Sequence, residues 1–279
     1  MFEKDVIILG PCAMDSRELY LETGKYLFDL MTKLGLQDSF LYKSSFDKAN
    51  RSSIRGGRGI NNLREAILCF AEMKELCPGI KLTTDIHESH QALPLSPFID
   101  VIQIPAFLCR QTDLLVACAQ RFPVVNIKKM QHLGPNNMNV GIDKIKEANP
   151  SCVAWLTDRG TNLGYSHLVS DFAMTKFYKE VWDKVILDCT HSTQRSRKMF
   201  PEGLQGDPEL AKSHFLAADI YGFDGVFAEV HPDRKNSTSD GDCMIDLSDV
   251  EKLLKKREVF KKVEEYKVVK IEKDDGPTF

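Results

Sequence analysis

The chain lacks any apolar run long enough to cross a membrane, and it lacks a strong excess of one charge. Its longest apolar segments have the length of a strand, well short of the roughly 20 residues that a membrane span needs. The 279 residues carry a formal net charge of −3, with 28% charged and 43% hydrophobic residues, which is ordinary for a globular protein. We therefore expect neither a membrane nor a nucleic acid as partner. The segment MFEKDVIILG also lacks the length and flanks of a secretory signal, so we expect a cytoplasmic location.

Several local signatures are missing as well. The 8 cysteines form no CxxC pair and have no regular spacing, which argues against a zinc ribbon and against a disulfide framework. We expect most of them to be small buried apolar residues. The segment GGRGIN lacks the strand and helix that flank a dinucleotide-binding loop. No GxSxG elbow occurs, which argues against a serine or cysteine hydrolase.

What does recur is a short β-branched run, followed by a polar cluster and by ten to twenty residues suited to a helix. This alternation is typical of βα units around a parallel sheet. The intervening segments, such as NLREAILCFAEMKELCPG and TDLLVACAQRF, carry apolar residues at helical spacing and end near Gly or Pro. The predicted strands are residues 5–10, 39–46, 80–86, 100–105, 124–129, 152–159, 184–191 and 225–231.

Eight such units predict a (β/α)₈ TIM barrel that forms a single domain. A doubly wound open sheet would give a similar pattern, and the number of units favours the barrel. We expect the catalytic domain to cover residues 1–265 and a charged C-terminal tail to cover residues 266–279.

In such a barrel, the active site is built from the carboxyl ends of the strands and from the loops that follow them. Each predicted unit supplies a polar or ionisable side chain there. These residues are Cys12, Lys43, Ser45, Lys48, Asp85, His87, Gln103, Arg110, Lys128, Arg159, His191, Glu229 and His231.

The first set of interest is cationic and comes from separate strand ends. It consists of Lys43, Lys48, Arg51, Arg110, Lys128 and Arg159. Arg binds planar oxyanions with two hydrogen bonds and Lys supplies a point charge, so the set predicts phosphate and carboxylate ligands. Six cations suit two anionic substrates better than one small anion. Surface ion pairs would also explain some of them, and a desolvated Lys43 or Lys128 could instead form a Schiff base.

The second set is Cys12, His191, Glu229 and Asp240. A thiol, an imidazole and two carboxylates are suitable ligands for a divalent ion such as zinc, iron or manganese. The spacing is long and contains no HExxH pattern, so residue type alone leaves Cys12 open as a buried core cysteine.

A long series of motifs resembles one enzyme family, the 3-deoxy-D-manno-octulosonate 8-phosphate synthases. In the family's order, the chain has GPCAMDS, KSSFDKANRSS, TTDIHES, IQIPAFLCRQTDLL, NIKK, LTDRGTNLGY, DCTHSTQ and DGVFAEVHPD. The resemblance extends to about residue 240. It implies a (β/α)₈ barrel that condenses phosphoenolpyruvate with arabinose 5-phosphate, in a step of lipopolysaccharide biosynthesis.

The resemblance also implies roles for individual residues. Lys43, Ser45, Lys48, Lys128 and Arg159 would hold phosphoenolpyruvate, while Asn50, Arg51 and Ser52 would hold arabinose 5-phosphate. Arg110 would reach a phosphate across a subunit interface, in a homo-oligomer that we expect to be a tetramer. We count Asp85 and Gln103 among the substrate-binding residues. We expect the catalytic residues to be Lys43, Lys48, Lys128, Arg159, His191 and Asp240.

The family has members with asparagine and members with cysteine at the position of Cys12. The members with cysteine resemble metal-dependent enzymes, and their further ligands fall on His191, Glu229 and Asp240. The resemblance therefore implies a divalent metal cofactor.

Three loops depart from the family pattern. They are residues 192–210, where the family has a glycine-rich loop, residues 241–247, and residues 53–61. These departures leave the acceptor sugar open, so a related synthase with another aldose phosphate stays as the alternative. Arg195, Arg197 and Lys198 either replace lost phosphate contacts or form an exposed basic turn. A catalytically inactive barrel would have lost cations or metal ligands, and this chain retains both.

Overall fold

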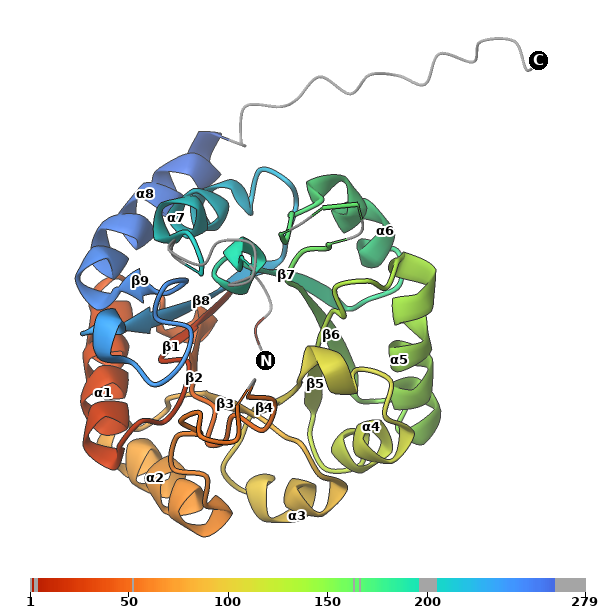
Figure 1. Ribbon diagram of the computed structural model, residues 1–279, viewed down its shortest axis with the longest axis horizontal. Helices are drawn as coiled ribbons and strands as arrows, with labels where there is room; N and C mark the ends of the chain where they lie inside the picture. The colour runs from red at the N-terminus through yellow and green to blue at the C-terminus, as the bar shows by residue number, and fades with distance from the viewer. Residues whose placement is uncertain are drawn as a thin grey trace.

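The computed structural model is a closed barrel of parallel strands inside a ring of helices (Figure 1). It describes residue 2 and residues 5–51, 53–162, 164–165, 167–195 and 205–263. β1 pairs with both β2 and β8, which closes the barrel. Each barrel strand lies inside a run that the sequence predicted, so the barrel prediction is confirmed. The strands are β1 (Val6–Gly10), β2 (Phe40–Lys43), β3 (Leu82–Asp85), β4 (Val101–Ile104), β5 (Val124–Lys128), β6 (Val153–Asp158), β7 (Lys184–Asp188) and β8 (Gly225–His231).

The helices alternate with the strands and cover the outside of the barrel (Figure 1). Three of them begin at polar residues that satisfy free backbone N–H groups: Ser16 accepts from the third residue after it, Asn62 from the second and third, and Asp207 from the third. The helices are α1 (Arg17–Lys33), α2 (Leu63–Leu76), α3 (Ala92–Leu95), α4 (Thr112–Ala119), α5 (Pro135–Ala148), α6 (Thr175–Lys179), α7 (Pro208–Ala217) and α8 (Val250–Val263).

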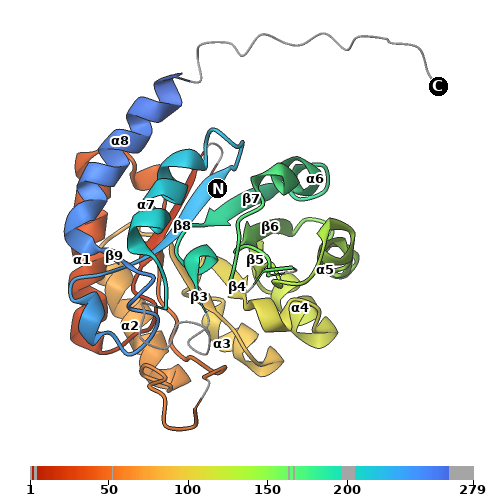
Figure 2. The ribbon, with the colours of Figure 1, turned by 45° about the horizontal axis from the view of Figure 1, so that its top comes forward.

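A short ninth strand, β9 (Ile245–Asp246), pairs with the end of β8. The sequence did not predict it, because two residues are too few to show a strand pattern. α8 follows and lies beside α1 and α7 (Figure 2). The predicted domain end at residue 265 and the predicted tail, residues 266–279, lie outside the described residues.

The interior of the barrel changes from apolar to polar toward the carboxyl ends of its strands. An apolar cluster that includes Phe2, Ile8 and Trp155 fills the amino-terminal part. Side chains two residues apart point to the same side of a strand, and on several strands the next inward position is ionisable or polar. The change runs from Leu41 to Lys43, from Val101 to Gln103, from Ile186 to Asp188 and from Phe227 to Glu229. The alternation thus places polar groups at one end of the barrel.

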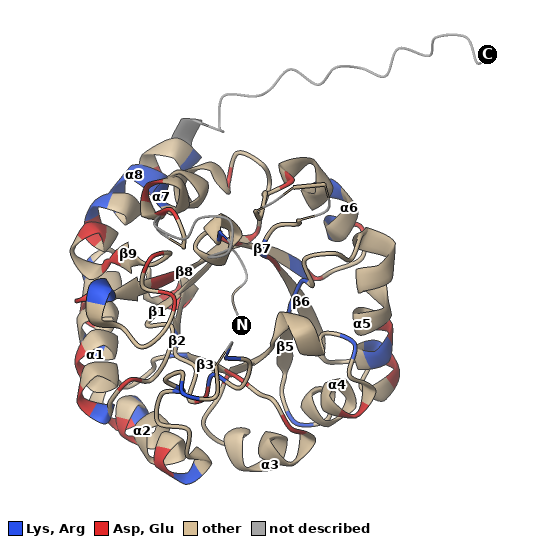
Figure 3. Ribbon diagram, in the orientation of Figure 1, with Lys and Arg blue, Asp and Glu red and all other residues tan. Residues whose placement is uncertain are grey.

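Charged residues of both signs cover the outer helices, and others lie at the strand ends around the barrel centre (Figure 3). Arg257 of α8 is buried away from the barrel centre: it is only 1% exposed and donates to Asp5 and Asp219. All 8 cysteines lie in the described part of the chain, buried and free, which confirms that they form no disulfide framework. Within that same part, no helix combines the length and the apolar character that crossing a bilayer requires.

A candidate metal and anion site at the carboxyl ends of the strands

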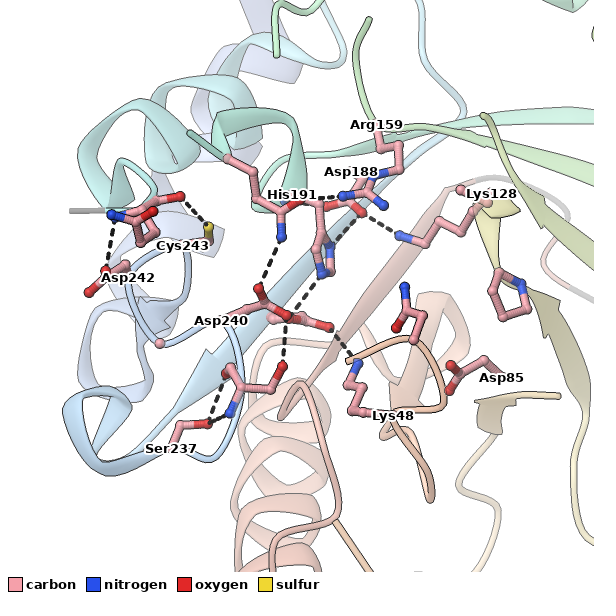
Figure 4. A pocket seen from close by; sticks show the side chains of 18 of the residues that line it. Lys48, Asp85, Lys128, Arg159, Asp188, His191, Ser237, Asp240, Asp242 and Cys243 are labelled. Atoms are coloured by element: carbon pink, nitrogen blue, oxygen red, sulfur yellow. Dashed lines mark hydrogen bonds and ion pairs between the residues drawn. The ribbon is translucent and has the colours of Figure 1, made fainter. Parts of the chain in front are cut away.

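A cavity of about 690 Å³ opens at the carboxyl ends of the barrel strands (Figure 4). This volume is typical of a small-molecule site. Most of the predicted site residues line it. They are Lys43, Lys48, Asn50, Arg51, Asp85, Gln103, Lys128, Arg159, His191, Glu229 and Asp240.

The other predicted residues lie in three kinds of place. Ser45 contacts two of the lining lysines, and Cys12 lies beside the lining carboxylates. Arg110 is exposed and is not among the residues lining the cavity in this single chain, so its predicted role across an interface stays a prediction. Ser52 lies outside the described residues.

Cys12, His191, Glu229 and Asp240 form a cluster in which the four donor atoms all lie within 4.8 Å of one another. Cys12 Sγ is 3.4 Å from Asp240 Oδ2, and His191 Nε2 is 3.4 Å from Glu229 Oε2. An ion with tetrahedral bonds of about 2.1 Å holds its ligand atoms roughly 3.4 Å apart. The spacing of these two pairs therefore fits a divalent cation.

The polar groups of this cluster fit a cation as well. Glu229 is fully buried, and its Oε2 atom accepts no hydrogen bond from any residue that the structure describes, although it faces the cluster. Burial acts to raise the pKa of Glu229, but His191 and the lysines Lys43 and Lys48 hold it below its ordinary value. Burial and the charge of Glu229 raise the pKa of the Cys12 thiol, so a bound cation would have to displace that proton. The residues present form a possible metal-ligand group.

The backbone between β1 and β2 places Cys12 in this cluster. β1 ends at Gly10, where an added Cβ atom would lie 1.9 Å from the carbonyl oxygen of Lys43, so only glycine permits this approach of the strands. Beyond β2, the chain stays beside the β1 loop: Met14 donates to the carbonyl of Ser45, and Ser45 donates to that of Cys12. The strand predicted at residues 39–46 therefore ends at Lys43, and the residues after it stay hydrogen-bonded to the loop that follows β1.

Two lysines from β2 and its loop lie next to the cluster. Lys43 is 2% exposed and donates to Ser45 Oγ at 2.8 Å and to Glu229 Oε1 at 3.2 Å. Lys48 donates to the same Oγ atom at 3.0 Å and lies 3.9 Å from Glu229 Oε1. The two ammonium groups and Glu229 therefore form one buried ionic group beside the cavity.

A second cationic group lies on β5 and β6. The Lys128 ammonium group pairs with the buried carboxylate of Asp188 and lies 3.3 Å from the centre of the Phe227 ring. Burial lowers the pKa of Lys128 to about 8; Asp188 acts to raise it, while Lys43 and Arg159 lower it further. Lys128 is therefore close to losing its charge near neutral pH, and an additional anion would stabilise the charge.

Arg51 approaches the cluster from the loop after β2. It donates to Ser239 Oγ at 2.6 Å and to the carbonyl of Thr238 at 3.2 Å. Ser239 Oγ in turn donates to Asp240 Oδ2 at 2.8 Å. Asp240 has a positive φ of 51°, a conformation that costs energy for a non-glycine residue and is common at functional sites.

Further polar atoms in the cavity lack partners. His87 Nε2 lies 3.3 Å from Asp85 Oδ2, but Asp85 Oδ1 and Gln103 Oε1 are buried and have no hydrogen-bond partner in the described part of the chain. Unsatisfied buried polar atoms carry a free-energy cost unless a ligand or water meets them. They indicate that the cavity is built for a polar ligand.

Sequence reasoning missed two residues of the site, Asp188 and Gln194. Asp188 Oδ2 accepts from both Lys128 and His191 Nδ1 (Figure 4), and Gln194 contacts both Arg159 and Asp240. Asp188 is a charged residue at the end of an apolar strand, which is a signal that the sequence does carry. Gln194 lies in a loop and carries no such signal.

The altered loops border the cavity. Gln205, Asp242 and Cys243 line it, and Gln205 N donates to Asp242. Arg195 forms an ion pair with Asp207 at 2.8 Å, while Arg197 and Lys198 lie outside the described residues.

Comparison with known proteins shows which family this chain resembles over most of its length. The model of the DAHP synthetase I family matches residues 3–265. A Brucella canis protein named 2-dehydro-3-deoxyphosphooctonate aldolase is 40% identical over 262 residues, which cover 92% of this chain and 91% of that protein. A Caulobacter vibrioides protein of the same name is 41% identical over 258 residues, which cover 90% of this chain and 86% of that protein.

Proposed function

The chain belongs to the DAHP synthetase I family, and we propose that it condenses phosphoenolpyruvate with arabinose 5-phosphate and water to give 3-deoxy-D-manno-octulosonate 8-phosphate and inorganic phosphate. The relatives' name, 2-dehydro-3-deoxyphosphooctonate aldolase, refers to this product. One observation carries the proposal: two groups of cations, each with one buried lysine, and a metal-ligand cluster border the same cavity.

In this proposal, phosphoenolpyruvate binds to the cations nearest the ends of the barrel strands. Lys43, Lys48 and Ser45 lie on one side of its site, and Lys128 and Arg159 lie on the other. The two sides suit a small molecule with a carboxylate and a phosphate, since each anion then meets at least one cation. Gln103 offers a further polar contact through its unpaired oxygen.

The acceptor belongs at the outer part of the cavity. Asn50, Arg51 and Asp85 line it, and Asp85 Oδ1 accepts no hydrogen bond from the described residues; Ser52, which the resemblance adds to this group, lies outside the described residues. A guanidinium group suits the phosphate of an aldose phosphate, and a carboxylate suits its hydroxyl groups.

Cys12, His191, Glu229 and Asp240 would hold the divalent ion. When bound, such an ion supplies Lewis acidity, which polarises a carbonyl oxygen or lowers the pKa of a water molecule. Zinc, iron and manganese all accept this donor set.

The chain's own residues supply the rest of the chemistry. The C3 carbon of phosphoenolpyruvate forms the new bond with the aldehyde carbon, water adds at C2, and the C2–O bond to phosphate breaks. Holding both substrates in one cavity accounts for much of the rate. Lys128 and Arg159 neutralise the charge that grows on the departing phosphate.

The acceptor sugar has one specific alternative. Gln205, Asp242 and Cys243 come from the loops that differ from the family pattern, and all three line the cavity. A related synthase that uses a different aldose phosphate therefore stays as the second candidate.

The proposal includes a homo-oligomer, expected to be a tetramer, and a cytoplasmic step of lipopolysaccharide biosynthesis. Arg110 is exposed, and the nearby Phe107 is 55% exposed on the same loop. A loop of this kind suits burial against a second subunit. Sedimentation velocity tests this part, and a monomer at enzymatic concentrations would contradict it.

Phosphate release from phosphoenolpyruvate tests the proposed reaction. The purified protein is assayed with a panel of aldose phosphates, first as isolated, then after chelation, and then after return of zinc, iron or manganese. We expect release with arabinose 5-phosphate, loss of release in chelator, and recovery with metal. Release with another sugar alone would favour the alternative acceptor, and full activity in chelator would exclude the metal requirement.

A Schiff-base mechanism is tested by a separate assay, because it predicts that borohydride traps a covalent adduct between a lysine and the substrate. Lys43 pairs with Glu229 and Lys128 pairs with Asp188, and the proposed reaction uses both lysines to bind anions and neither as a nucleophile. Borohydride treatment in the presence of the substrates should therefore label neither lysine.

A further inference from the structure

Asp188 connects a metal ligand to a cation of the anion site. Its Oδ2 atom accepts from His191 Nδ1 at 2.8 Å and also pairs with the Lys128 ammonium group. Its Oδ1 atom accepts from the backbone N–H groups of Thr190 and His191 at 3.2 and 2.9 Å. Because an ionised carboxylate only accepts hydrogen bonds, the His191 proton lies on Nδ1, and Nε2 is left to face the ligand cluster.

Gln194 makes the same kind of connection on the other side of the cluster. Its Oε1 atom accepts from Arg159 at 2.5 Å, and its Nε2 atom donates to Asp240 Oδ1 at 3.0 Å. The orientation of the amide is therefore fixed, since Arg159 has only donors and Asp240 has only acceptors. Asp240 Oδ2 remains directed at Cys12.

The two bridges come from one short segment, residues 188–194, at the end of β7. Each joins one cation that would bind phosphoenolpyruvate to one residue that would bind the metal. We propose that Asp188 and Gln194 are positioning residues that couple the two sites, so that the divalent ion and phosphoenolpyruvate each raise the affinity for the other. This inference rests on the proposed function, because it assigns phosphoenolpyruvate to Lys128 and Arg159.

The geometry gives the direction of the coupling. An anion bound at Lys128 and Arg159 partly neutralises their positive charge. Asp188 then accepts the hydrogen bond from His191 Nδ1 more strongly, which makes His191 Nε2 a stronger metal ligand. The same anion holds Arg159, and through Gln194 it holds Asp240 in place. By linkage, a bound metal raises the affinity for phosphoenolpyruvate by the same factor.

Cobalt(II) binding measures this coupling without turnover. Binding is followed, in the absence of oxygen, by the absorption band of the Cys12 thiolate bound to cobalt, with and without phosphoenolpyruvate and with no aldose phosphate. We expect phosphoenolpyruvate to tighten cobalt binding about 10-fold in the wild-type chain. In Gln194→Ala the factor should fall below about 3-fold. A factor in Gln194→Ala equal to the wild-type factor would overturn the inference.

The ratio of the cobalt affinities with and without phosphoenolpyruvate distinguishes loss of coupling from structural damage. A variant that only loosens the fold weakens the binding of both ligands but leaves unchanged the factor by which one ligand tightens the other. Loss of the bridge removes that factor. Gln131→Ala is the matched control, since Gln131 lines the same cavity and its Oε1 atom has no hydrogen-bond partner among the residues described. It should keep the wild-type factor, and loss of coupling there as well would count against a specific role of Gln194.

Gln194→Glu gives a second measurement. The new carboxylate still accepts from Arg159 but repels Asp240, so cobalt binding should weaken while phosphoenolpyruvate binding to the metal-free protein persists. Equal cobalt affinities of Gln194→Glu and wild type would contradict the bridge. Binding of phosphoenolpyruvate to the metal-free wild type is measured in parallel by calorimetry. If it binds but shows no coupling, only this inference fails; if it does not bind in any metal state, the proposed function fails with it.

Discussion

Cys12 Sγ lies 3.4 Å from Asp240 Oδ2, although 228 positions separate the two residues in the chain. Closure of the barrel brings them together, because β1 and β8 are neighbours and the loops after both strands leave from the same end. A donor set of this kind has no local sequence pattern. It becomes visible only when the carboxyl ends of the strands are compared.

Replacement of Cys12 tests the metal site. Cys12→Asn exchanges a thiolate for a neutral amide, so we expect the affinity for zinc to fall at least about 100-fold, the upper end of what loss of a supporting group alone causes. Metal content after dialysis, measured by atomic emission, gives the result. Cys118→Ala, in which an equally buried cysteine of α4 is removed, should keep its metal. Retention of metal by Cys12→Asn would show that the thiolate is not a ligand.

The barrel strands could be predicted because β-branched runs and helical periodicity are local properties of the sequence. The same holds for the residues at strand ends: Lys43, Lys128 and Glu229 each follow an apolar run directly. The contacts between strands could not be predicted in this way. That Lys43 pairs with Glu229 depends on barrel closure and on side-chain rotamers, which no local pattern records.

Loop residues show the limit more sharply. Arg51 reaches the carbonyl of Thr238 from a different loop, and Gln194 reaches Asp240 across 46 positions. Neither residue lies on a regular element, so periodicity carries no information about it. Arg51 was predicted as one of the cations that follow the strand ends, and the family resemblance added its expected substrate, while Gln194 needed the structure.

The buried group around Arg257 predicts a large loss of stability on substitution. Arg257 donates to Asp5 at 2.8 and 3.0 Å and to Asp219 at 2.7 Å. Arg257→Met leaves the Asp219 carboxylate without a partner among the described residues and leaves Asp5 paired with Lys261 alone, so we expect a cost of about 3–5 kcal/mol, because a buried charge then lacks compensation. Thermal unfolding should occur on the order of 10 °C lower.

Lys255→Met is the matched control on the same helix. Lys255 is 60% exposed and pairs with Glu251. Exposed pairs contribute less than about 1 kcal/mol, so its midpoint should stay within a few degrees of the wild type. A similar loss in both variants would indicate a general effect of charge removal from α8.

Substitution of Arg51 should affect the binding of one substrate and not of the other. Arg51→Ala should raise KM for the aldose phosphate about 10- to 100-fold, because a hydrogen bond to a charged group contributes about 1.5–3 kcal/mol. KM for phosphoenolpyruvate should change less than about 3-fold, since that substrate is assigned to other cations. Steady-state kinetics at saturating metal measures both constants. Arg55→Ala, in the exposed part of the same loop, should change neither, and an equal rise of both KM values in Arg51→Ala would refute the assignment.

The pKa of Lys128 predicts how the reaction depends on pH. Burial lowers this pKa to about 8, against the opposing effect of Asp188. Lys128 carries its charge below that pH and loses it above, so kcat/KM for phosphoenolpyruvate should fall as the pH rises through about 8. kcat/KM reports the free enzyme, and the substrate phosphate has already lost its second proton near pH 6. The bound phosphate raises the pKa of Lys128, so kcat should fall only at higher pH.

Lys128→Arg identifies the group responsible for this alkaline fall. A guanidinium group keeps its charge throughout the range, so the fall in kcat/KM should move to higher pH, even if the absolute rate is lower. Lys33→Arg, at a lysine that is 64% exposed on α1, should retain the wild-type profile. The profile is measured at saturating metal and aldose phosphate, so that only the phosphoenolpyruvate step titrates. If kcat/KM in Lys128→Arg still falls at the same pH as in the wild type, another group is responsible for the fall, and Lys128 stays charged over the pH range measured.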